Sequence, residues 1–572
     1  MAAERWLIDT PPSERFPVYT RLNANDVLPN PITPLGASLA WVPHILPGWA
    51  AGYVAMGAFT PEEVFSDRAA VGGFFYGHLY INQSNVRVVG IRAGLGWEAI
   101  DAAFFSPASP PHDPDPRDVN EKCSVSMGAT ANWALTTTLY PDLEEERALA
   151  ERWRSNRPDL VTLTPAALVG WARALMPIER VTWRGETIAS NQAATGPAVI
   201  GQLLGAADRS LIVRVIGHAG EVDSALPSYA LWELSRAVRA DASLGAEFDR
   251  GVDRLLARAH ESHPDFVARF ASFLREFGYR GPSEWDLGAD SWETRPELPL
   301  ALVDRLRHMD EDASPVARQR DQAGDTEAAL QQALDIIGDN ETARQTLHLA
   351  IASARRFAGW RERGKTNCIK VLHEARMALF ELGRRLHAEG HLEHPQQLFM
   401  ATDEELDTVV ADPASMSRVL AEREQQWRNL HDVELPTFFD TRDPMCPLGE
   451  LPRRGVRNVK VAQPGEILQG QAASAGVGRG LARVVHDTAS IADFQPGEIL
   501  IAPQTDPSWT PLFMVSAGVV VDVGAMGSHA MIVSRELGIP CAAGVTDATR
   551  RIPTGARVEV DGSTGAVTVL SL

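Results

Sequence analysis

A proline-rich stretch divides this chain of 572 residues into two parts with different hydrophobic patterns. Between Pro436 and Gly465 the chain carries further prolines at positions 444, 447, 452 and 464, among charged residues. Each proline fixes its own backbone and disfavours helix at the residue before it, so we expect a semi-rigid linker over 436–465. This linker separates a large N-terminal domain, 1–435, from a compact C-terminal domain, 466–572.

The N-terminal domain is predicted to be mainly α-helical. Its first ~110 residues are rich in proline, glycine and aromatic residues, which indicates irregular structure with a few short strands or helices. From about residue 120 to residue 434 the apolar residues recur with helical spacing. Phe266, Phe270, Phe273 and Leu274, for example, form one stripe that is typical of core packing. The stretch 326–392, rich in Ala, Leu and Arg, is long enough for two or three helices.

The C-terminal domain has the pattern of a small α/β fold. Short β-rich runs cover Glu498–Ala502, Gly518–Val523, Pro540–Val545, Val558–Val560 and Ala566–Leu570. The last two runs flank 561–565, whose sequence Asp-Gly-Ser-Thr-Gly predicts a hairpin connection. One helix is expected after the run Gly518–Val523.

Composition and charge exclude several classes of protein. Lys and Arg number 54 against 74 Asp and Glu, and the net charge of −20 argues against nucleic-acid binding, which needs clustered cations. The four cysteines lie far apart with no C-x-x-C spacing, so we expect a reduced, intracellular protein. The N-terminus lacks the pattern of a signal peptide, and no apolar run reaches the ~18 residues of a membrane helix. The prediction is a cytoplasmic protein with no membrane partner.

The segment Gly518–Leu537 carries the most informative chemistry. An apolar strand leads into a glycine-bearing turn, Ser528 is a good N-cap, and His529 then falls at the first helical position. Gly524 and Gly527 allow backbone shapes that a side chain would block, and we expect them to keep the approach to the imidazole open. The sequence therefore predicts an exposed histidine at a helix N-terminus.

A histidine in this place suits phosphoryl chemistry. The helix dipole and the unpaired amides of the first turn favour an anion there. A neutral imidazole is a nucleophile that can attack a phosphoryl group, and the phosphoramidate would lie in the same favourable field. His529 is one of 15 histidines, and a histidine beside a helix cap can equally have a structural role or simply be exposed. Spacing alone leaves these alternatives open.

The same segment closely resembles the phosphohistidine signature of the swivelling (mobile) domain of the phosphoenolpyruvate-utilising enzymes, which include pyruvate phosphate dikinase, phosphoenolpyruvate synthase and rifampin phosphotransferase. Neighbouring segments resemble other parts of that domain in the same order: Gly470–Gly480, Gly497–Ala502, Asp506–Phe513 and Leu537–Cys541. The resemblance implies that His529 is phosphorylated and that Ser528 and Gly527 contact the phosphate. Gly527 stands where some members have Thr or Leu, a difference that can alter access to the histidine.

Three segments of the N-terminal domain resemble the substrate-binding domain of rifampin phosphotransferase and its relatives: Asp26–Leu35, Phe277–Asp286 and Arg361–Lys365. In the second segment Tyr279 replaces the usual His of the family. In the family segment similar to the third, the first Arg and the final Lys lie beside the substrate hydroxyl and the incoming phosphate. The resemblance therefore implies a substrate-binding role for 1–435.

Four residues of this domain are candidates for the site. If they are helical, Arg361 and Lys365 share one face, and two cations can converge on a phosphoryl group. The alternative is a solvated basic face. Arg280 and Glu284 are candidates for substrate or phosphate binding, but with Asp286 they can instead form a buried salt-bridge network.

The resemblance implies a phosphotransferase subunit. A partner ATP-grasp protein, similar to the phosphoenolpyruvate/pyruvate-binding domain, would hold ATP and Mg²⁺ and phosphorylate His529, as in the two-subunit phenylphosphate synthases that this arrangement also resembles. We expect no cofactor or metal on this chain itself. The acceptor would be a hydroxyl of an apolar or aromatic small molecule. Two alternatives stay open: phosphorylation followed by elimination, which dehydrates an alcohol, and a non-catalytic phosphocarrier or binding protein.

Overall fold

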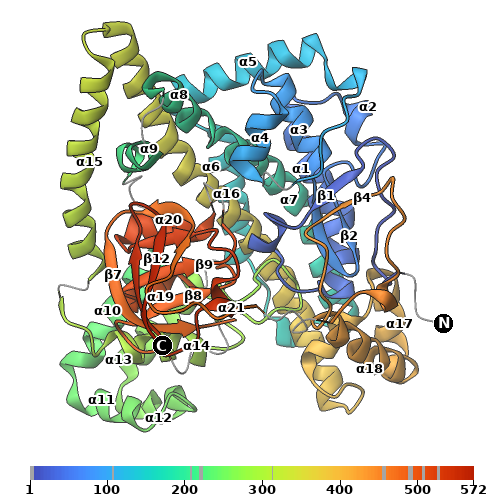
Figure 1. Ribbon diagram of the computed structural model, residues 1–572. Coiled ribbons are helices and arrows are strands. Elements are labelled where there is room, and N and C mark those ends of the chain that lie inside the picture. The colour runs from blue at the N-terminus through green and yellow to red at the C-terminus, as the bar shows by residue number, and fades with distance from the viewer. Residues whose placement is uncertain are drawn as a thin grey trace. The chain divides into compact units, whose positions relative to one another are not determined.

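The computed structural model describes the chain over 5–105, 109–205, 209–217, 223–311, 314–453, 459–486, 494–505, 509–524 and 528–572 (Figure 1). The chain forms two compact units. Unit 1 consists of Met1–Gln192, Trp285–Ala289 and Arg363–Asn458, and unit 2 consists of Ala193–Glu284, Asp290–Glu362 and Val459–Leu572. The boundaries of these units differ from the division into 1–435 and 466–572 that the sequence predicts, since unit 2 joins helices from the middle of the chain to the C-terminal sheet.

Unit 1 contains a small antiparallel sheet, with strand order β2-β3-β1-β4. Its strands are β1 (Val18–Thr20), β2 (Gly72–Phe75), β3 (His78–Asn82) and β4 (Phe438–Asp440). The strand β4 lies inside the predicted linker and pairs with β1. The ring of Phe439 stacks on that of Tyr19, with centroids 5.3 Å apart. The first part of 436–465 is therefore held in unit 1 by backbone pairing and aromatic packing.

Helices make up most of the rest of unit 1. They are α1 (Leu46–Ala55), α2 (Pro61–Val64), α3 (Gln83–Arg92), α4 (Trp97–Phe104), α5 (Glu121–Thr136), α6 (Pro141–Ser155), α7 (Pro165–Gln192), α17 (Leu406–Ala411) and α18 (Pro413–Leu430). The long helix α16 (Glu341–Ala388) begins in unit 2 and ends in unit 1. The prediction of two or three helices in 326–392 is confirmed, because α15 (Pro315–Ile337) and α16 cover most of that stretch.

Unit 2 combines a helical part with the C-terminal sheet. Its remaining helices are α8 (Thr195–Leu204), α9 (Arg209–Ile216), α10 (Leu226–Ala240), α11 (Ala242–Asp249), α12 (Leu255–Ser262), α13 (Pro264–Phe277), α14 (Glu297–Leu306), α19 (Thr510–Val515), α20 (His529–Leu537) and α21 (Ala548–Arg551). The predicted stripe is confirmed, since Phe266, Phe270 and Phe273 of α13 are buried in the core of this unit.

The C-terminal sheet has eight strands in the order β5-β12-β11-β7-β8-β9-β10-β6 (Figure 1). They are β5 (Ile467–Gln469), β6 (Gln471–Ser474), β7 (Val477–Val484), β8 (Ile499–Ala502), β9 (Gly518–Val521), β10 (Cys541–Ala543), β11 (Arg557–Asp561) and β12 (Ala566–Ser571). The central strands β7, β8, β9 and β10 run parallel, and the hairpin of β11 and β12 closes where predicted, with Asp561 opposite Ala566. The predicted fold class, mainly helical with a C-terminal α/β domain, is confirmed.

Alternation along the central strands divides the apolar core in two. Leu500 and Val519 belong to one core cluster, while the neighbouring Ile499 and Val520 belong to the other. Successive residues of a strand point to opposite faces, so the sheet is covered on both sides. The first cluster also contains α19, α20 and residues of α10, α13 and α14, and α19 packs against α10 and α14. This shared core joins the C-terminal domain to the helices of unit 2.

All four cysteines lie in the described part of the chain and are free thiols. Over the same described residues, we find no helix that has both the length and the apolar character to cross a lipid bilayer.

Candidate functional site

The start of α20 places the candidate nucleophile. The strand β9 ends at Val521, and after the turn Ser528 adopts an extended backbone at the N-cap, so His529 is the first helical residue as predicted. The helix ends at Gly538, whose φ of +68° is the left-handed conformation that favours glycine at a helix end. Gly527 lies outside the described residues, so its predicted contact with phosphate has no structural account here.

His529 is buried, and the prediction of an exposed imidazole is wrong. Only 4% of the residue is exposed. Thr505 Oγ1 forms a hydrogen bond of 3.0 Å with Nδ1, and Thr510 Oγ1 forms one of 3.1 Å with Nε2. The ring of Phe513 lies 5.8 Å from the imidazole, centroid to centroid. Both ring nitrogens therefore contact hydroxyl groups, and an aromatic side chain packs beside the ring.

The cause of the wrong prediction is the helix α19, which the sequence pattern did not reveal. It has six residues, Thr510–Val515, with Pro511 at its second position. A helix this short shows too few turns for a hydrophobic period to be recognised. Thr510 and Phe513 both belong to α19, so the missed helix supplies two side chains that contact the imidazole.

The first turn of α20 retains the polar groups of an anion site. Ile532 N–H donates to Ser528 C=O, and this bond begins the hydrogen-bond ladder of the helix. The N–H groups of the three preceding residues are not used by that ladder, as at any helix start. The side chain of Ser528 makes no capping bond, and its buried Oγ has no hydrogen-bond partner among the described residues. This turn thus combines a positive dipole end with an uncommitted hydroxyl.

Arg280 and Glu284 form a buried ion pair in the helical part of unit 2. Arg280 Nη1 lies 2.9 Å from Glu284 Oε1, and each side chain is only 1% exposed. Burial opposes the charge of Arg280, but Glu284 together with Tyr279, Glu362 and Asp223 outweighs it and raises the pKa of the guanidinium above its usual value. Asp286 does not join them: its carboxylate accepts bonds from the backbone N–H and hydroxyl of Thr33 in unit 1. The expected three-residue network is therefore two separate arrangements.

Arg361 and Lys365 lie one turn apart on α16, so the predicted helical spacing is confirmed. Arg361 Nη1 lies 3.4 Å from Glu362 Oε1, and Glu362 also helps to raise the pKa of Arg280. Burial lowers the pKa of Arg535, and Arg361 adds to that decrease. Arg361 thus acts on the last turn of α20, which is the end opposite to His529.

Two groups of buried polar residues were missed by sequence reasoning. Thr505 lies just before the segment Asp506–Phe513, whose resemblance to the swivelling domain was noted, and Thr510 lies inside it, but a single threonine carries no signal of its own. Glu146 of α6 and Glu179 of α7 are 3% and 0% exposed. Burial raises the pKa of Glu146 to about 8 and that of Glu179 well above its usual value. The helix α6 is rich in charged residues, so its pattern gives no sign that Glu146 is buried.

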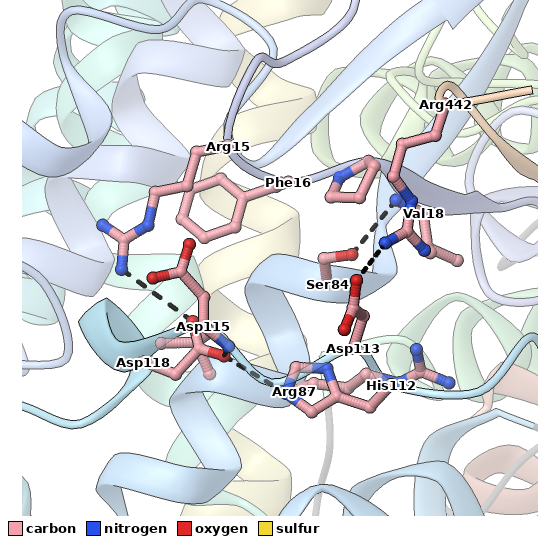
Figure 2. A pocket seen from close by; sticks show the side chains of 12 residues that line it. Arg15, Phe16, Val18, Ser84, Arg87, His112, Asp113, Asp115, Asp118 and Arg442 are labelled. Carbon is pink, nitrogen blue, oxygen red and sulfur yellow. Dashed lines mark hydrogen bonds and ion pairs between the residues drawn. The ribbon is translucent and has the colours of Figure 1, made fainter.

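A small polar cavity in unit 1 is too small for an organic acceptor. Figure 2 shows its lining, with Arg442 paired to Asp113 on one side and His112 paired to Asp118 on the other. The cavity has a volume of about 30 Å³, which suits a water molecule. Its side chains are already matched in charge, so we do not assign it to the site.

Two family models match this chain. Residues 186–362 match the rifampicin phosphotransferase fourth domain. Residues 494–565 match the mobile domain of the phosphoenolpyruvate-utilising enzymes. The resemblances predicted from the sequence, to a swivelling domain at the C-terminus and to rifampin phosphotransferase before it, are thereby confirmed. The second match contains His529, Thr505 and Thr510.

Known proteins resemble the chain over different lengths. An uncharacterised protein of Mycobacterium tuberculosis (strain ATCC 25618 / H37Rv) is 27% identical over 99% of this chain and 63% of its own length. A rifampicin phosphotransferase of Streptomyces sviceus is 32% identical over 52% of this chain and 34% of its own length. An uncharacterised phosphotransferase of Bacillus subtilis (strain 168), YvkC, is 25% identical over 60% of this chain and 41% of its own length. The chain thus spans less than two thirds of each of these relatives.

Proposed function

We propose that this chain, which carries a rifampicin phosphotransferase fourth domain and the mobile domain of a phosphoenolpyruvate-utilising enzyme, is a phosphotransferase that relays a phosphoryl group through His529. The observation that supports this most directly is the position of His529. It is the first residue of α20, follows the N-cap Ser528, and lies inside the matched mobile domain. A phosphoryl group bonded to this ring would lie near the positive end of the helix dipole.

The relay has two transfers. In the first, a ring nitrogen of His529 attacks a phosphorus atom of ATP, the P–O bond to the leaving group breaks, and the leaving group departs with the electron pair. We place ATP and its Mg²⁺ on an ATP-grasp domain of a partner chain, as in the two-subunit enzymes that the sequence resembles. In the second transfer a hydroxyl of an apolar or aromatic small molecule takes the phosphoryl group and loses its proton to a base. Arg361 and Lys365 would stabilise the charge on the phosphoryl oxygens.

The relay is tested with the full chain, its ATP-grasp partner and ATP that is labelled in all of its phosphates. We expect acid-labile label on the wild-type chain and none on His529→Ala, because the phosphoramidate bond needs the imidazole. A matched control, His260→Ala, removes an exposed histidine and should keep the label. Label that survives His529→Ala would contradict the proposal.

Mass spectrometry of the small molecule then identifies the reaction. Gain of a phosphoryl group indicates transfer, and loss of water indicates phosphorylation followed by elimination. Label on His529 without any change in a small molecule would instead indicate a phosphocarrier.

A further inference from the structure

The two threonines that contact His529 occupy chemically different positions. Thr505 lies in the loop after β8 and bonds to Nδ1, the nitrogen nearer the backbone, at 3.0 Å. Thr510 begins α19 and bonds to Nε2, the nitrogen at the far end of the ring, at 3.1 Å. Thr505 is 3% exposed and Thr510 is 0% exposed, so water does not compete for either bond. Neither residue had a role in the proposed relay.

We take the remote nitrogen, Nε2, as the one that attacks the phosphoryl donor, because it lies at the end of the ring away from the backbone. A nucleophile must approach phosphorus to about 3–3.5 Å before the bond forms. Thr510 Oγ1 already occupies a position 3.1 Å from Nε2, so the donor and this hydroxyl cannot be present together. Nδ1 takes no part in the attack, and its bond to Thr505 can persist throughout.

We propose that Thr505 and Thr510 are positioning residues with opposite effects on His529, an inference that rests on the proposed relay. Thr505 accepts a hydrogen bond from Nδ1–H, which leaves the lone pair on Nε2. Thr510 donates to that lone pair and blocks attack by Nε2 until α19 moves away from the ring. When Nε2 attacks, the N–P bond forms, the bond from phosphorus to the leaving group breaks, and Nδ1 keeps its proton, which stays hydrogen-bonded to Thr505 Oγ1.

The placement of α19 explains how the closed state is maintained. This helix packs against α20 on one side and against α10 and α14 on the other. Phe513, four positions along from Trp509 and buried like it, lies beside the imidazole. Thr510 is therefore fixed by the apolar core that joins the C-terminal domain to the helices of unit 2. Loosening of that packing would withdraw the hydroxyl from Nε2 and expose the ring.

The test uses the full chain and potassium phosphoramidate, which phosphorylates histidine without a protein partner by transferring its phosphoryl group and releasing ammonia. The exposed residues His260, His308 and His348 serve as internal references. Peptide mass spectrometry should show wild-type His529 reacting more slowly than these three. Thr510→Ala should accelerate the reaction of His529, and Thr505→Val should slow it, each by roughly three- to tenfold, the range for one hydrogen bond. Thr510→Ser and Thr505→Ser should restore the wild-type rate.

A second measurement follows the ring directly. Proton–nitrogen correlation spectra of histidine-labelled protein should show the proton on Nδ1 in the wild type and a larger share on Nε2 in Thr505→Val. Wild-type His529 that reacts as fast as His260, or carries its proton on Nε2, would overturn the inference, and so would changes of the same sign in Thr505→Val and Thr510→Ala. None of these outcomes affects the relay, which is tested separately with ATP and the His529→Ala variant.

Discussion

Two buried polar sites of unit 2, at His529 and at Arg280, stabilise their side chains in different ways. His529 contacts two neutral hydroxyl groups, at 3.0 and 3.1 Å. Arg280 contacts a carboxylate, Glu284, at 2.9 Å. A hydrogen bond between neutral groups contributes about 1 kcal/mol, whereas separating a buried ion pair leaves an uncompensated charge and costs several times more. Breaking the hydrogen bonds of His529 should therefore cost less free energy than separating Arg280 from Glu284.

Breaking the ion pair should give the largest effect on stability. We expect Glu284→Gln to lower the free energy of unfolding by about 3–5 kcal/mol, because the buried guanidinium loses its counter-charge. Urea denaturation measures the change. The matched control is Glu422→Gln on α18, which breaks an exposed pair with Arg418, also four residues apart, and should change little.

The same variant separates structural from catalytic roles for the pair. If Glu284→Gln is destabilised and still accepts label on His529 in proportion to its folded fraction, Arg280 and Glu284 are structural. Loss of transfer to the small molecule at unchanged stability would instead indicate contact with substrate or phosphate, and would contradict the comparison above.

Glu146 in unit 1 extends the comparison to a buried carboxylate that makes no hydrogen bond to the described residues. Neither carboxylate oxygen has a hydrogen-bond partner among the described residues, and burial raises its pKa to about 8 from an ordinary 4.5. Between these values the folded protein keeps a proton that the unfolded chain releases, so stability falls as pH rises through this window. In Glu146→Gln the free energy of unfolding should fall by about 2–3 kcal/mol less than in the wild type over this pH window.

Urea midpoints at pH values near the two ends of this window test the prediction. The wild type and Glu146→Gln should differ least at the acidic end and most at the alkaline end, where the variant is the more stable. Glu145→Gln alters the exposed neighbour on α6 and should leave the pH dependence unchanged. A wild-type stability that rises across the window would show that Glu146 is ionised in the folded protein.

The sequence was informative where one residue type has one local role, and less so where tertiary packing decides. Strands β8 and β9, the hairpin of β11 and β12, and the start of α20 at His529 were predicted because period, turn residues and N-cap are local signals. The burial of His529 depends on α19, a helix too short to show a period. The pairing of Arg280 with Glu284, and the burial of Glu146, depend on which helices meet, and a single sequence carries no record of that.

Replacing Ser528 should give the smallest change in stability, and it tests whether the histidine site depends on phosphorylation for its hydrogen bonds. It occupies the N-cap of α20, but its hydroxyl accepts no bond from the helix. Asn120 caps α5 and accepts a bond of 3.2 Å from Cys123 N–H. Loss of a cap that makes its bond costs about 1 kcal/mol, so Asn120→Ala should lose that amount and Ser528→Ala less than about half of it.

The hydroxyl of Ser528 should instead matter once His529 is phosphorylated. If it then donates to a phosphoryl oxygen, Ser528→Ala should shorten the lifetime of the acid-labile label by roughly two- to tenfold, the value of one hydrogen bond to a charged group. Decay of the label after removal of ATP measures this, with Asn120→Ala as the control that loses stability and keeps the lifetime. A Ser528→Ala variant as destabilised as Asn120→Ala, with an unchanged label, would mean that the hydroxyl serves the resting fold. Like the ion pair of Arg280 and Glu284, this hydroxyl would then stabilise the resting fold and not the phosphorylated histidine.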